Sequence, residues 1–375
     1  MRKRMRSQSQ RRSSDSPGRA GRMPAAPVQA GCLRSQASHS TAGEIEATER
    51  GAILIVVLWV LLALSLLALS FSASVRTEVN AARNTVDQKQ SYYMARAGVE
   101  YAVYKVLEAQ SAFNQAQQAL QGQVGQPQVP DVYTGSLRLN LADGGADVEI
   151  IDESGKLNLN LAQAHLIYNL LLVIGVDQET ADVITDSIED WRDQDDLYRP
   201  NGAESDYYQK LPHPYFAKNG LFDVPEELLL VRGVTPEIYY GKKGLSETGE
   251  RIEYYGLQKY FTTFSSFNRI NINSAPLAVL ASIPGLDYDV AQEIVAMRQQ
   301  APLTGINEVM ERIPGIPTEV GNYLSMMRSQ VYTIVSSGSL NNSGVIGRVR
   351  AVIRVGGLGP KPYTVLYWNE SNMEM

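Results

Sequence analysis

The sequence is poor in cysteine and histidine. Of its 375 residues one is cysteine, Cys32, and three are histidine. Beyond Cys32 the chain has no thiol for a disulfide, so an exported domain built from it must hold together by packing or by metal binding. His165 and His213 lie far apart and near no nucleophile motif. Nothing in the sequence therefore suggests nucleophilic catalysis, and we expect the protein not to be an enzyme.

Charge is absent between Ala52 and Val75. The only polar residues in this run are Ser65, Ser70, Ser72 and Ser74. An uncharged run of this length can cross a bilayer core of about 30 Å as a helix, and it exceeds the roughly 7–15 apolar residues of a cleaved secretory signal. Residues 1–51 hold ten Lys or Arg against four acids, which places the N-terminus in the cytoplasm. From hydropathy alone, a plain signal anchor is the favoured interpretation.

The helical pattern continues past the apolar run. Apolar residues recur at spacings of three and four, first from Val75 to Val86 and then from Tyr93 to Tyr104. No proline interrupts the pattern, and Gly98 is the one helix-weakening residue before Gly122. The sequence predicts a single helix of roughly 55 residues, about 80 Å long. Its first half is apolar all round and its second half is amphipathic.

Alternating apolar residues predict a half-buried antiparallel sheet. Two strands are expected near residues 137–141 and 148–151, joined by a turn at 143–145, and further strands at 331–335, 349–355 and 363–368. About 170 residues separate the two groups, which is too many for a loop. A domain is therefore expected to be inserted into the sheet.

The predicted insert contains a repeat. Residues 157–160 read Leu-Asn-Leu-Asn and residues 270–273 read Ile-Asn-Ile-Asn, and each leads into an apolar helix pattern that ends at a glycine. The glycine turn occurs twice more in a shorter form. The four glycines are Gly175, Gly233, Gly285 and Gly315. A helix, a glycine with positive φ and a second helix make an αα-hairpin. Such units are similar to helix-hairpin-helix units, which in many proteins hold DNA phosphate.

A DNA-binding function is the alternative that these hairpins raise. DNA-binding hairpins usually carry a second glycine two residues after the first, and the residues there are Asp177, Thr235, Asp287 and Pro317. Aspartate repels phosphate and proline has no N–H to donate. The whole chain carries −6 and residues 1–51 carry +6, so residues 52–375 carry −12, which disfavours nucleic acid. We expect no nucleic-acid partner. The alternative is a membrane-anchored helix-hairpin-helix DNA-binding protein of a pilus or DNA-uptake system.

The densest chemical signal is a block of carboxylates. From Asp177 to Asp206 there are eleven acids against two arginines. The turn at Pro200-Asn201-Gly202 can bring the later acids back to the earlier ones, and several oxygen ligands on a turn suit Ca²⁺. The candidate ligands are Asp190, Asp193, Asp195, Asp196, Glu204 and Asp206. On composition alone, a solvated acidic face partly paired with Arg192 and Arg199 remains open.

The N-terminal helix resembles that of type IV pilins and pseudopilins, in which a prepilin peptidase cuts after a glycine. Here the cut would fall between Gly51 and Ala52. Most of that family has glutamate as the fifth mature residue, where this chain has Val56. The subgroup without the glutamate is the K-type minor pseudopilin of type II secretion. The Asp-Trp-x-Asp-x-Asp block at 190–195 and Gly-Ala-Glu at 202–204 are similar to that subgroup.

The resemblance covers residues 50 to about 368 and implies an α+β fold. A pilin-like long N-terminal helix with an antiparallel sheet would be interrupted by an inserted all-α domain of helix-hairpin-helix or SAM-like repeats. The expected parts are a cleaved basic leader (1–51), a transmembrane and filament-core half-helix (52–73), an amphipathic half-helix with the first strands (74–155), the inserted domain (156–328) and the C-terminal strands (329–368).

The resemblance also implies a function. The protein would cap the tip of the type II secretion pseudopilus, help to initiate its assembly, and so help to export folded proteins across the outer membrane. Its partners would be the I- and J-type minor pseudopilins, the pseudopilus, the prepilin peptidase and the inner membrane of a Gram-negative bacterium. It would span that membrane once, with a periplasmic C-terminal domain that holds a structural Ca²⁺. Without glutamate at Val56 it could not neutralise the N-terminal amine of a subunit ahead, so it would sit first.

Overall fold

The computed structural model describes residues 45–119, 134–245, 251–254, 256–265, 267–327, 330–356 and 361–370. The chain divides into two compact units, residues 1–74 and 75–375. Cys32 and most of the predicted leader lie outside the described residues. The finer domain bounds expected from the sequence stay a prediction.

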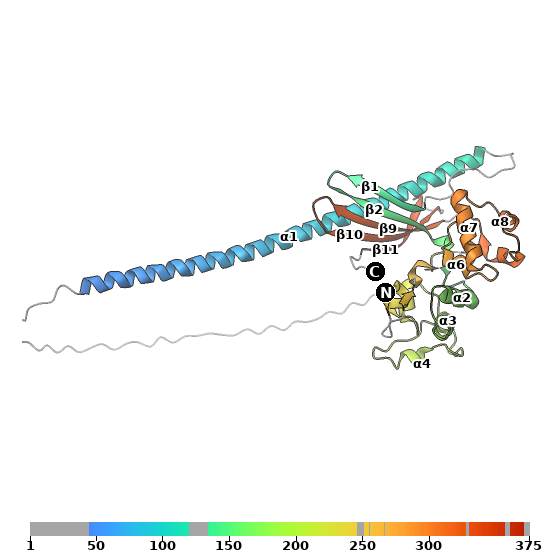
Figure 1. Ribbon diagram of the computed structural model, residues 1–375, viewed down its shortest axis with the longest axis horizontal. Helices are drawn as coiled ribbons and strands as arrows, with labels where there is room; N and C mark the ends of the chain where they lie inside the picture. Colours follow the sequence, from blue (N-terminus) through green and yellow to red (C-terminus); the bar gives the residue numbers. More distant parts are fainter. Residues whose placement is uncertain are drawn as a thin grey trace, which may run out of the picture. The chain divides into compact units, whose positions relative to one another are not determined.

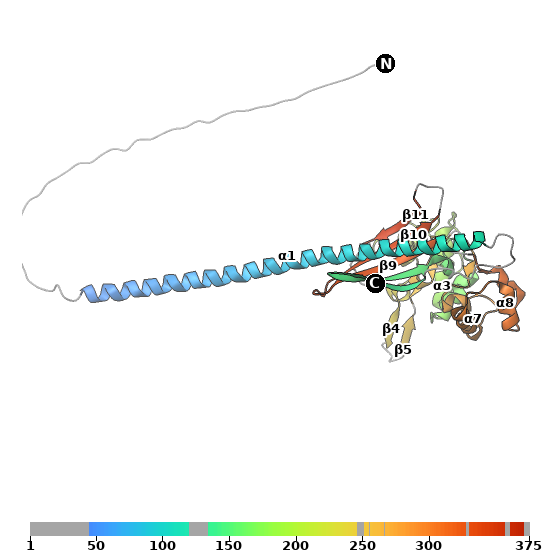
Figure 2. The same ribbon diagram turned by 90° about the horizontal axis from the view of Figure 1, so that it is seen from above.

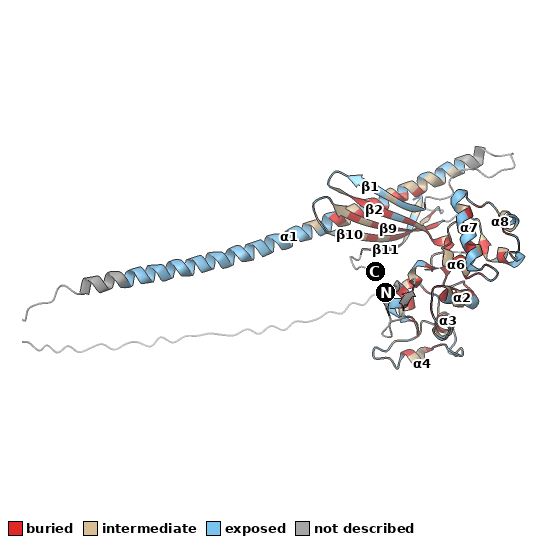
Figure 3. Cartoon of the chain, in the orientation of Figure 1, coloured by how far each residue is buried: buried red, intermediate tan, exposed pale blue. Residues whose placement is uncertain are grey.

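Helix α1 (Ile45–Ala119) is the element that the two units share. It has 75 residues, against the roughly 55 expected from the apolar and amphipathic pattern. The helix begins ahead of Ala52, so the predicted Gly51–Ala52 junction lies within it, and it also continues past the Tyr93–Tyr104 pattern to Ala119. In the first unit the large apolar side chains from Ile53 to Phe71 are exposed (Figure 3). Among the described residues, one helix is long and apolar enough to cross a membrane.

A five-stranded antiparallel sheet forms the first part of the second unit (Figure 1). Its strands are β1 (Gly135–Leu141), β2 (Gly144–Asp152), β9 (Val331–Leu340), β10 (Ile346–Val355) and β11 (Tyr363–Asn369). Their order is β1-β2-β9-β10-β11. Strands β2 and β9 pair directly, with Asp152 opposite Tyr332. The intervening segment therefore leaves the sheet and returns to it at neighbouring strands, as the inserted-domain hypothesis requires.

The amphipathic part of α1 packs on one face of this sheet (Figures 1 and 2). Small and branched residues on α1, among them Ala95, Val99 and Ala102, are buried against the strands. Gly98 permits the closest approach, because a Cβ there would lie 2.3 Å from Ser336 Oγ and 2.7 Å from Ala146 Cβ. The glycine that weakens the helix in isolation is thus needed where helix and sheet meet.

The insert consists of two structural repeats. The first repeat, residues 157–262, contains β3 (Leu157–Asn158), α2 (Ala164–Val173), α3 (Gln178–Arg192), α4 (Ser205–Tyr208), η2 (Pro225–Leu230), α5 (Pro236–Tyr240), β4 (Lys242–Leu245), β5 (Arg251–Tyr254), η3 (Leu257–Lys259) and β6 (Phe261–Thr262). The second repeat, residues 270–325, contains β7 (Ile270–Asn271), α6 (Leu277–Ala281), α7 (Tyr288–Gln300), α8 (Ile306–Arg312), η4 (Thr318–Asn322) and β8 (Leu324–Ser325). The short 3-10 helix η1 (Glu153–Gly155) precedes them.

Each repeat is closed by a parallel pair of two-residue strands. Leu157 lies opposite Phe261 in the first repeat, and Ile270 lies opposite Leu324 in the second. With the antiparallel β4–β5 pair, the inserted domain is predominantly helical but contains short strands that the sequence pattern did not predict. A two-residue strand has no alternating pattern, which explains why the sequence did not predict the two parallel pairs.

The same hydrogen bonds recur in both repeats. The amide of Asn160 binds the backbone of Phe222 through both its oxygen and its nitrogen, and Asn273 binds Leu303 in the same way. Near the end of α3, Arg192 donates to the carbonyl of Leu159. The residue at the corresponding place in α7, Arg298, donates to the carbonyl of Ile272, 2.6 Å away. These matched bonds identify equivalent positions in the two repeats.

The predicted hairpin glycines adopt positive φ. Gly175 and Gly285 have φ of 97° and 89°, and Gly233 and Gly315, in the shorter turns, have 86° and 99°. Each of the first two glycines precedes by two residues an aspartate that caps the next helix, since Asp177 accepts from Thr180 N and Asp287 accepts from Val290 N. The hairpin prediction is confirmed. The two acids that argued against phosphate binding prove to be helix caps.

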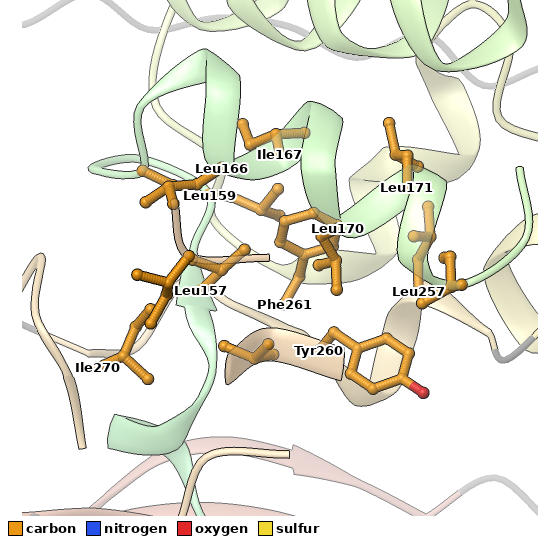
Figure 4. Packing of buried hydrophobic residues seen from close by; sticks show 14 of the residues in the cluster. Leu157, Leu159, Leu166, Ile167, Leu170, Leu171, Leu257, Tyr260, Phe261 and Ile270 are labelled. Atoms are coloured by element: carbon orange, nitrogen blue, oxygen red, sulfur yellow. The ribbon is translucent and has the colours of Figure 1, made fainter. Parts of the chain in front are cut away.

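A second hydrophobic core lies inside the insert (Figure 4). It gathers apolar residues from both repeats, including Leu157 and Leu159 ahead of α2, Leu170 on α2, Phe261 on β6 and Ile270 on β7. This core is separate from the one between α1 and the sheet. The insert therefore has a packed interior of its own from which its loops can be held.

Candidate metal centre

One segment distinguishes the first repeat from the second. Between Arg192 and Phe222 lie 29 residues, whereas four lie between Arg298 and the equivalent Leu303. We call the extra segment, residues 193–221, the inserted loop. Most of the predicted metal ligands lie on it.

An aromatic cluster anchors the inserted loop to the repeat. Trp191, buried at the end of α3, lies with its ring centroid 5.3 Å from that of Tyr208, 6.3 Å from that of Tyr215 and 6.4 Å from that of Phe222. The Tyr208 and Tyr215 rings stack at 5.2 Å. Because these rings come from both ends and the middle of the loop, their packing fixes its path.

Gly202 brings the loop against the end of α3. A Cβ at this position would lie 1.9 Å from Asp190 Oδ2, so a side chain here would displace the carboxylate. The Gly202 carbonyl accepts a hydrogen bond from Arg232 Nη1 at 2.9 Å. This contact places the following residues, Ala203 and Glu204, in the interior.

Three carboxylates meet where the loop returns. Asp193, Asp195 and Glu204 each offer an oxygen, and these oxygens all lie within 4.8 Å of one another. Glu204 is 2% exposed. Within the part of the chain that the structure describes, neither of its carboxylate oxygens has a hydrogen-bond partner, and Asp193 Oδ1 also has none. Oxygens at these separations can share one cation at about 2.3–2.6 Å, the Ca²⁺–oxygen distance.

The surroundings of Glu204 disfavour its ionised form. Burial raises the pKa of Glu204, and the neighbouring carboxylates Asp190, Asp193, Asp196 and Asp195 raise it further, to about 7. Buried carboxylates are normally hydrogen-bonded or paired. An oxygen-seeking divalent cation would supply the missing partner, so the donor set fits Ca²⁺.

Arg199 occupies the other side of the group. Its Nη1 lies 2.7 Å from Asp190 Oδ1 and 2.6 Å from Asp193 Oδ2. Burial alone would lower the pKa of Arg199, but the Asp193 and Asp190 carboxylates raise it on balance. Burial raises the pKa of Asp190 despite this partner. Asp193 Oδ2 is therefore paired with the guanidinium, while Oδ1 has no hydrogen-bond partner among the described residues.

The six predicted ligands are not all gathered at one point. Asp193, Asp195 and Glu204 form the group, and Asp190 adjoins it through Arg199. Asp196 instead accepts from Asn219 Nδ2 at 3.1 Å. Asp206 is paired with Lys210 at 3.0 Å on the surface.

Three contributions were not foreseen from the sequence. Arg199 was predicted only as a partial counterion of a solvated face, and the sequence did not indicate the close approach of Gly202 or the bond from Asn219. Asn219 is the one described non-glycine residue with clearly positive φ, at 47°. Its asparagine identity fits that conformation, but nothing in the sequence connects it to Asp196.

Two of the four hairpin glycines, Gly233 and Gly285, are covered by the protein itself, whereas Gly315 faces open space. A Cβ on Gly285 would lie 2.9 Å from Pro317 Cγ, and one on Gly233 would lie 2.9 Å from Ile184 Cγ1. DNA-binding hairpins need this surface for phosphate. The packing therefore agrees with hairpins that build a domain.

These features define a class of protein. It is an α+β protein in which a long, apolar-tipped N-terminal helix packs on an antiparallel sheet, in the manner of a pilin, and two helix-hairpin-helix repeats interrupt that sheet. Comparisons with known proteins agree with this description. Residues 138–241 match the family model "Type II secretion system (T2SS), protein K". Residues 265–331, which contain the second repeat, match the model "Helix-hairpin-helix motif".

Individual relatives point to the same family. A relative from Escherichia coli (strain K12), whose name refers to the same protein K, is 28% identical over 205 residues, which are 51% of this chain and 60% of that protein. The type II secretion system protein K of Pseudomonas aeruginosa is 25% identical over 243 residues, 59% of this chain and 68% of that protein. The chain is thus similar to the type II secretion system protein K family, and it spans 60% and 68% of the length of these two relatives.

A solved structure with a similar chain is "The Crystal Structure of the GspK-GspI-GspJ complex from enterotoxigenic Escherichia coli Type 2 Secretion System". The match has a TM-score of 0.49 at 19% identity and covers 74% of this chain and 99% of that chain.

Proposed function

We propose that this chain is a minor pseudopilin that caps the tip of a type II secretion pseudopilus. There it would help to initiate assembly, and so to export folded proteins across the outer membrane. One combination carries the proposal. An uncharged run, with Val56 in place of the usual glutamate, leads within α1 into a half that packs on a sheet, and a large inserted domain interrupts that sheet. A filament subunit must stack in both directions, whereas this chain has a bulky insert and lacks the carboxylate that would receive a subunit ahead. The role is structural rather than catalytic.

The N-terminal helix would supply the membrane anchor and the filament contact. We propose cleavage by a prepilin peptidase between Gly51 and Ala52, after membrane insertion with the N-terminus cytoplasmic and residues beyond the span in the periplasm. The exposed apolar side chains from Ile53 to Phe71 favour this assignment, because such a surface is stable in lipid or against other apolar helices. The I- and J-type minor pseudopilins are the proposed partners of this surface.

Co-expression of the full chain with the I- and J-type proteins tests the proposed function. The expected result is a mature protein that begins at Ala52, elutes with both partners, and does not polymerise alone. N-terminal sequencing and size-exclusion chromatography of the extracted complex provide the two measurements. An intact leader or a terminus near Ser74, together with no complex, would leave only a signal anchor.

We propose, in addition, that Asp193, Asp195 and Glu204 hold a structural Ca²⁺, with Asp190 nearby through Arg199. When bound, the cation would supply the counter-charge that these buried carboxylates lack. A ligand that binds only the folded state stabilises it by about 2.7 kcal/mol at a hundred times its Kd. Chelation should therefore lower the melting temperature of the full chain in detergent. Melting that is indifferent to the chelator would favour a cation-free acidic loop.

A further inference from the structure

The inserted loop exposes apolar side chains that its own packing does not use. Among the described residues beyond Phe71, the three most exposed large hydrophobic side chains are Leu197 at 75%, Phe216 at 70% and Leu221 at 63%. All three lie on the inserted loop. The second repeat has no counterpart of this segment, since four residues there, 299–302, stand in place of the 29 of the inserted loop. A loop that only held a cation would have no need of these side chains.

Hydrogen bonds order the segments of the loop that carry Leu197 and Leu221. Asn219 Nδ2 donates to the Asp195 carbonyl at 3.3 Å and to Asp196 Oδ1 at 3.1 Å. These bonds place the segment that leads to Leu221 beside the segment that carries Leu197. Gly220 N donates to the Trp191 carbonyl at 3.3 Å, which ties the same segment to the end of α3.

The residues on both sides of Phe216 are held by hydrogen bonds and ring stacking. Its neighbour Ala217 donates from its N–H to Ser205 Oγ at 3.2 Å. The other neighbour, Tyr215, stacks on Tyr208 and donates from its hydroxyl to the Leu230 carbonyl at 2.7 Å. A surface that is already ordered loses little side-chain and loop entropy when it binds. The three apolar side chains, which we call the patch, therefore stand on ordered segments of the loop.

The surroundings of this patch are strongly acidic. Residues 177–223 contain twelve acids and four Lys or Arg, a net charge of −8. The four cations already have acidic partners within this part of the structure: Arg192 pairs with Glu189, Arg199 with Asp190 and Asp193, Lys210 with Asp206, and Lys218 with Asp223 and Glu227. One divalent cation would still leave a net charge of −6. The patch therefore sits in a negative field that favours a basic partner.

We propose that Leu197, Phe216 and Leu221 form a docking surface for a segment of another protein that carries both apolar and basic side chains. The apolar contacts supply affinity, and the acidic surroundings select the sign of the partner's charge. The same field repels acidic segments, nucleic acid and anionic lipid. The inference goes beyond the proposed secretion function and does not depend on it.

Fluorescence anisotropy with the full chain in phosphatidylcholine nanodiscs tests this proposal, with empty discs subtracted. The probes are short labelled peptides of leucine and lysine, of leucine and glutamate, and of serine and lysine. The leucine–lysine peptide is expected to bind more tightly than the other two. The combined change Leu197→Ser, Phe216→Ser and Leu221→Ser should weaken its binding about tenfold or more, which corresponds to about 1.4 kcal/mol.

A matched variant guards against a general effect of removing surface leucine or aromatic groups. Leu172→Ser with Tyr288→Ser changes two exposed apolar residues on α2 and α7 and should leave peptide binding unchanged. The near-ultraviolet circular dichroism of the cluster around Trp191 reports whether the triple variant retains the fold of the loop. Equal binding by the triple variant and the unmodified chain would overturn the proposal. So would equal binding of the lysine and glutamate peptides.

Discussion

The two repeats of the insert share a scaffold but differ in one loop. Each begins with an apolar-Asn pair, turns at a glycine with positive φ, starts its second helix on an aspartate cap, and uses an arginine to hold its first strand. In the second repeat the chain passes directly from Arg298 to Leu303. In the first repeat the inserted loop lies between Arg192 and Phe222, the residue equivalent to Leu303.

This difference separates what holds the domain together from what the domain is used for. The shared hydrogen bonds of Asn160 and Asn273 satisfy backbone groups where each loop ends, and they serve stability in both repeats. The carboxylate group, the unpartnered oxygens of Glu204 and the exposed apolar patch occur on the first repeat. The two repeats thus share one scaffold, and the first repeat carries the additional loop.

The largest effect is expected at the base of the inserted loop. Trp191→Ala removes a buried ring that contacts three other rings, and it should lower the free energy of unfolding by about 3–5 kcal/mol. It should also abolish stabilisation by Ca²⁺. Met297→Ala, at the equivalent place in the second repeat, should destabilise the chain but leave the Ca²⁺ effect intact. Urea unfolding of the detergent-solubilised chain, with and without Ca²⁺, measures both quantities. Equal Ca²⁺ responses in the two variants would contradict the division between the repeats.

A smaller effect is expected at the glycine that faces Asp190. Gly202→Ala puts a methyl group 1.9 Å from Asp190 Oδ2, and such overpacking costs about 1–3 kcal/mol. Gly321→Ala in the second repeat is the control. Its Cβ would be 3.8 Å from Ile306 Cγ1, an ordinary contact, so its effect should stay within about 0.5 kcal/mol. Thermal melting of both variants gives the comparison, and identical shifts would refute the close approach.

The two strand-holding arginines should behave alike. Arg192→Met and Arg298→Met each leave the carbonyl that directly follows a strand without its donor, on Leu159 after β3 and on Ile272 after β7. A lost partner at a buried polar group costs about 1–3 kcal/mol. The Arg192 change should cost somewhat more, because that guanidinium also binds the Ala162 carbonyl and Glu189. If the Arg298 variant had the same free energy of unfolding as the unmodified chain, the two arginines would not serve the same stabilising role.

The smallest effect is expected at Asp206. Its ion pair with Lys210 is largely exposed, with side-chain exposures of 59% and 77%, and exposed pairs of this kind contribute about 0.3–0.5 kcal/mol. Asp206→Asn should therefore change neither stability nor Ca²⁺ affinity appreciably. A loss of affinity in calorimetric titration of this variant would restore Asp206 to the ligand set.

The sequence predicted the features that follow from period and composition. Alternation located the strands of the main sheet, spacing of three and four located α1, and the paired Asn motifs with their glycines located both hairpins. Buried Ala181 and Ala291, each six residues after its glycine, follow the same repeat. The acidic block was also evident, because eleven acids in one short stretch leave a strong compositional signal.

Contacts that depend on the path of a loop were not predictable in this way. No local rule places Arg199 between Asp190 and Asp193, or turns Asp206 outward to Lys210 while Glu204 turns inward. The sequence also gave no reason for α1 to start at Ile45, since residues before Ala52 have no apolar period. The equivalence of Phe222 and Leu303 becomes visible only through the asparagine amides that bind them.

Calorimetric titration of Ca²⁺ into the full chain in detergent shows whether the first repeat holds a cation through Asp193, Asp195 and Glu204 while the second repeat holds none. The unmodified chain should bind Ca²⁺, Glu204→Gln should lose that binding, and Asp289→Asn, which removes an exposed acid on α7 of the second repeat, should retain it. Binding that survives Glu204→Gln unchanged, or no binding to the unmodified chain, would contradict the account.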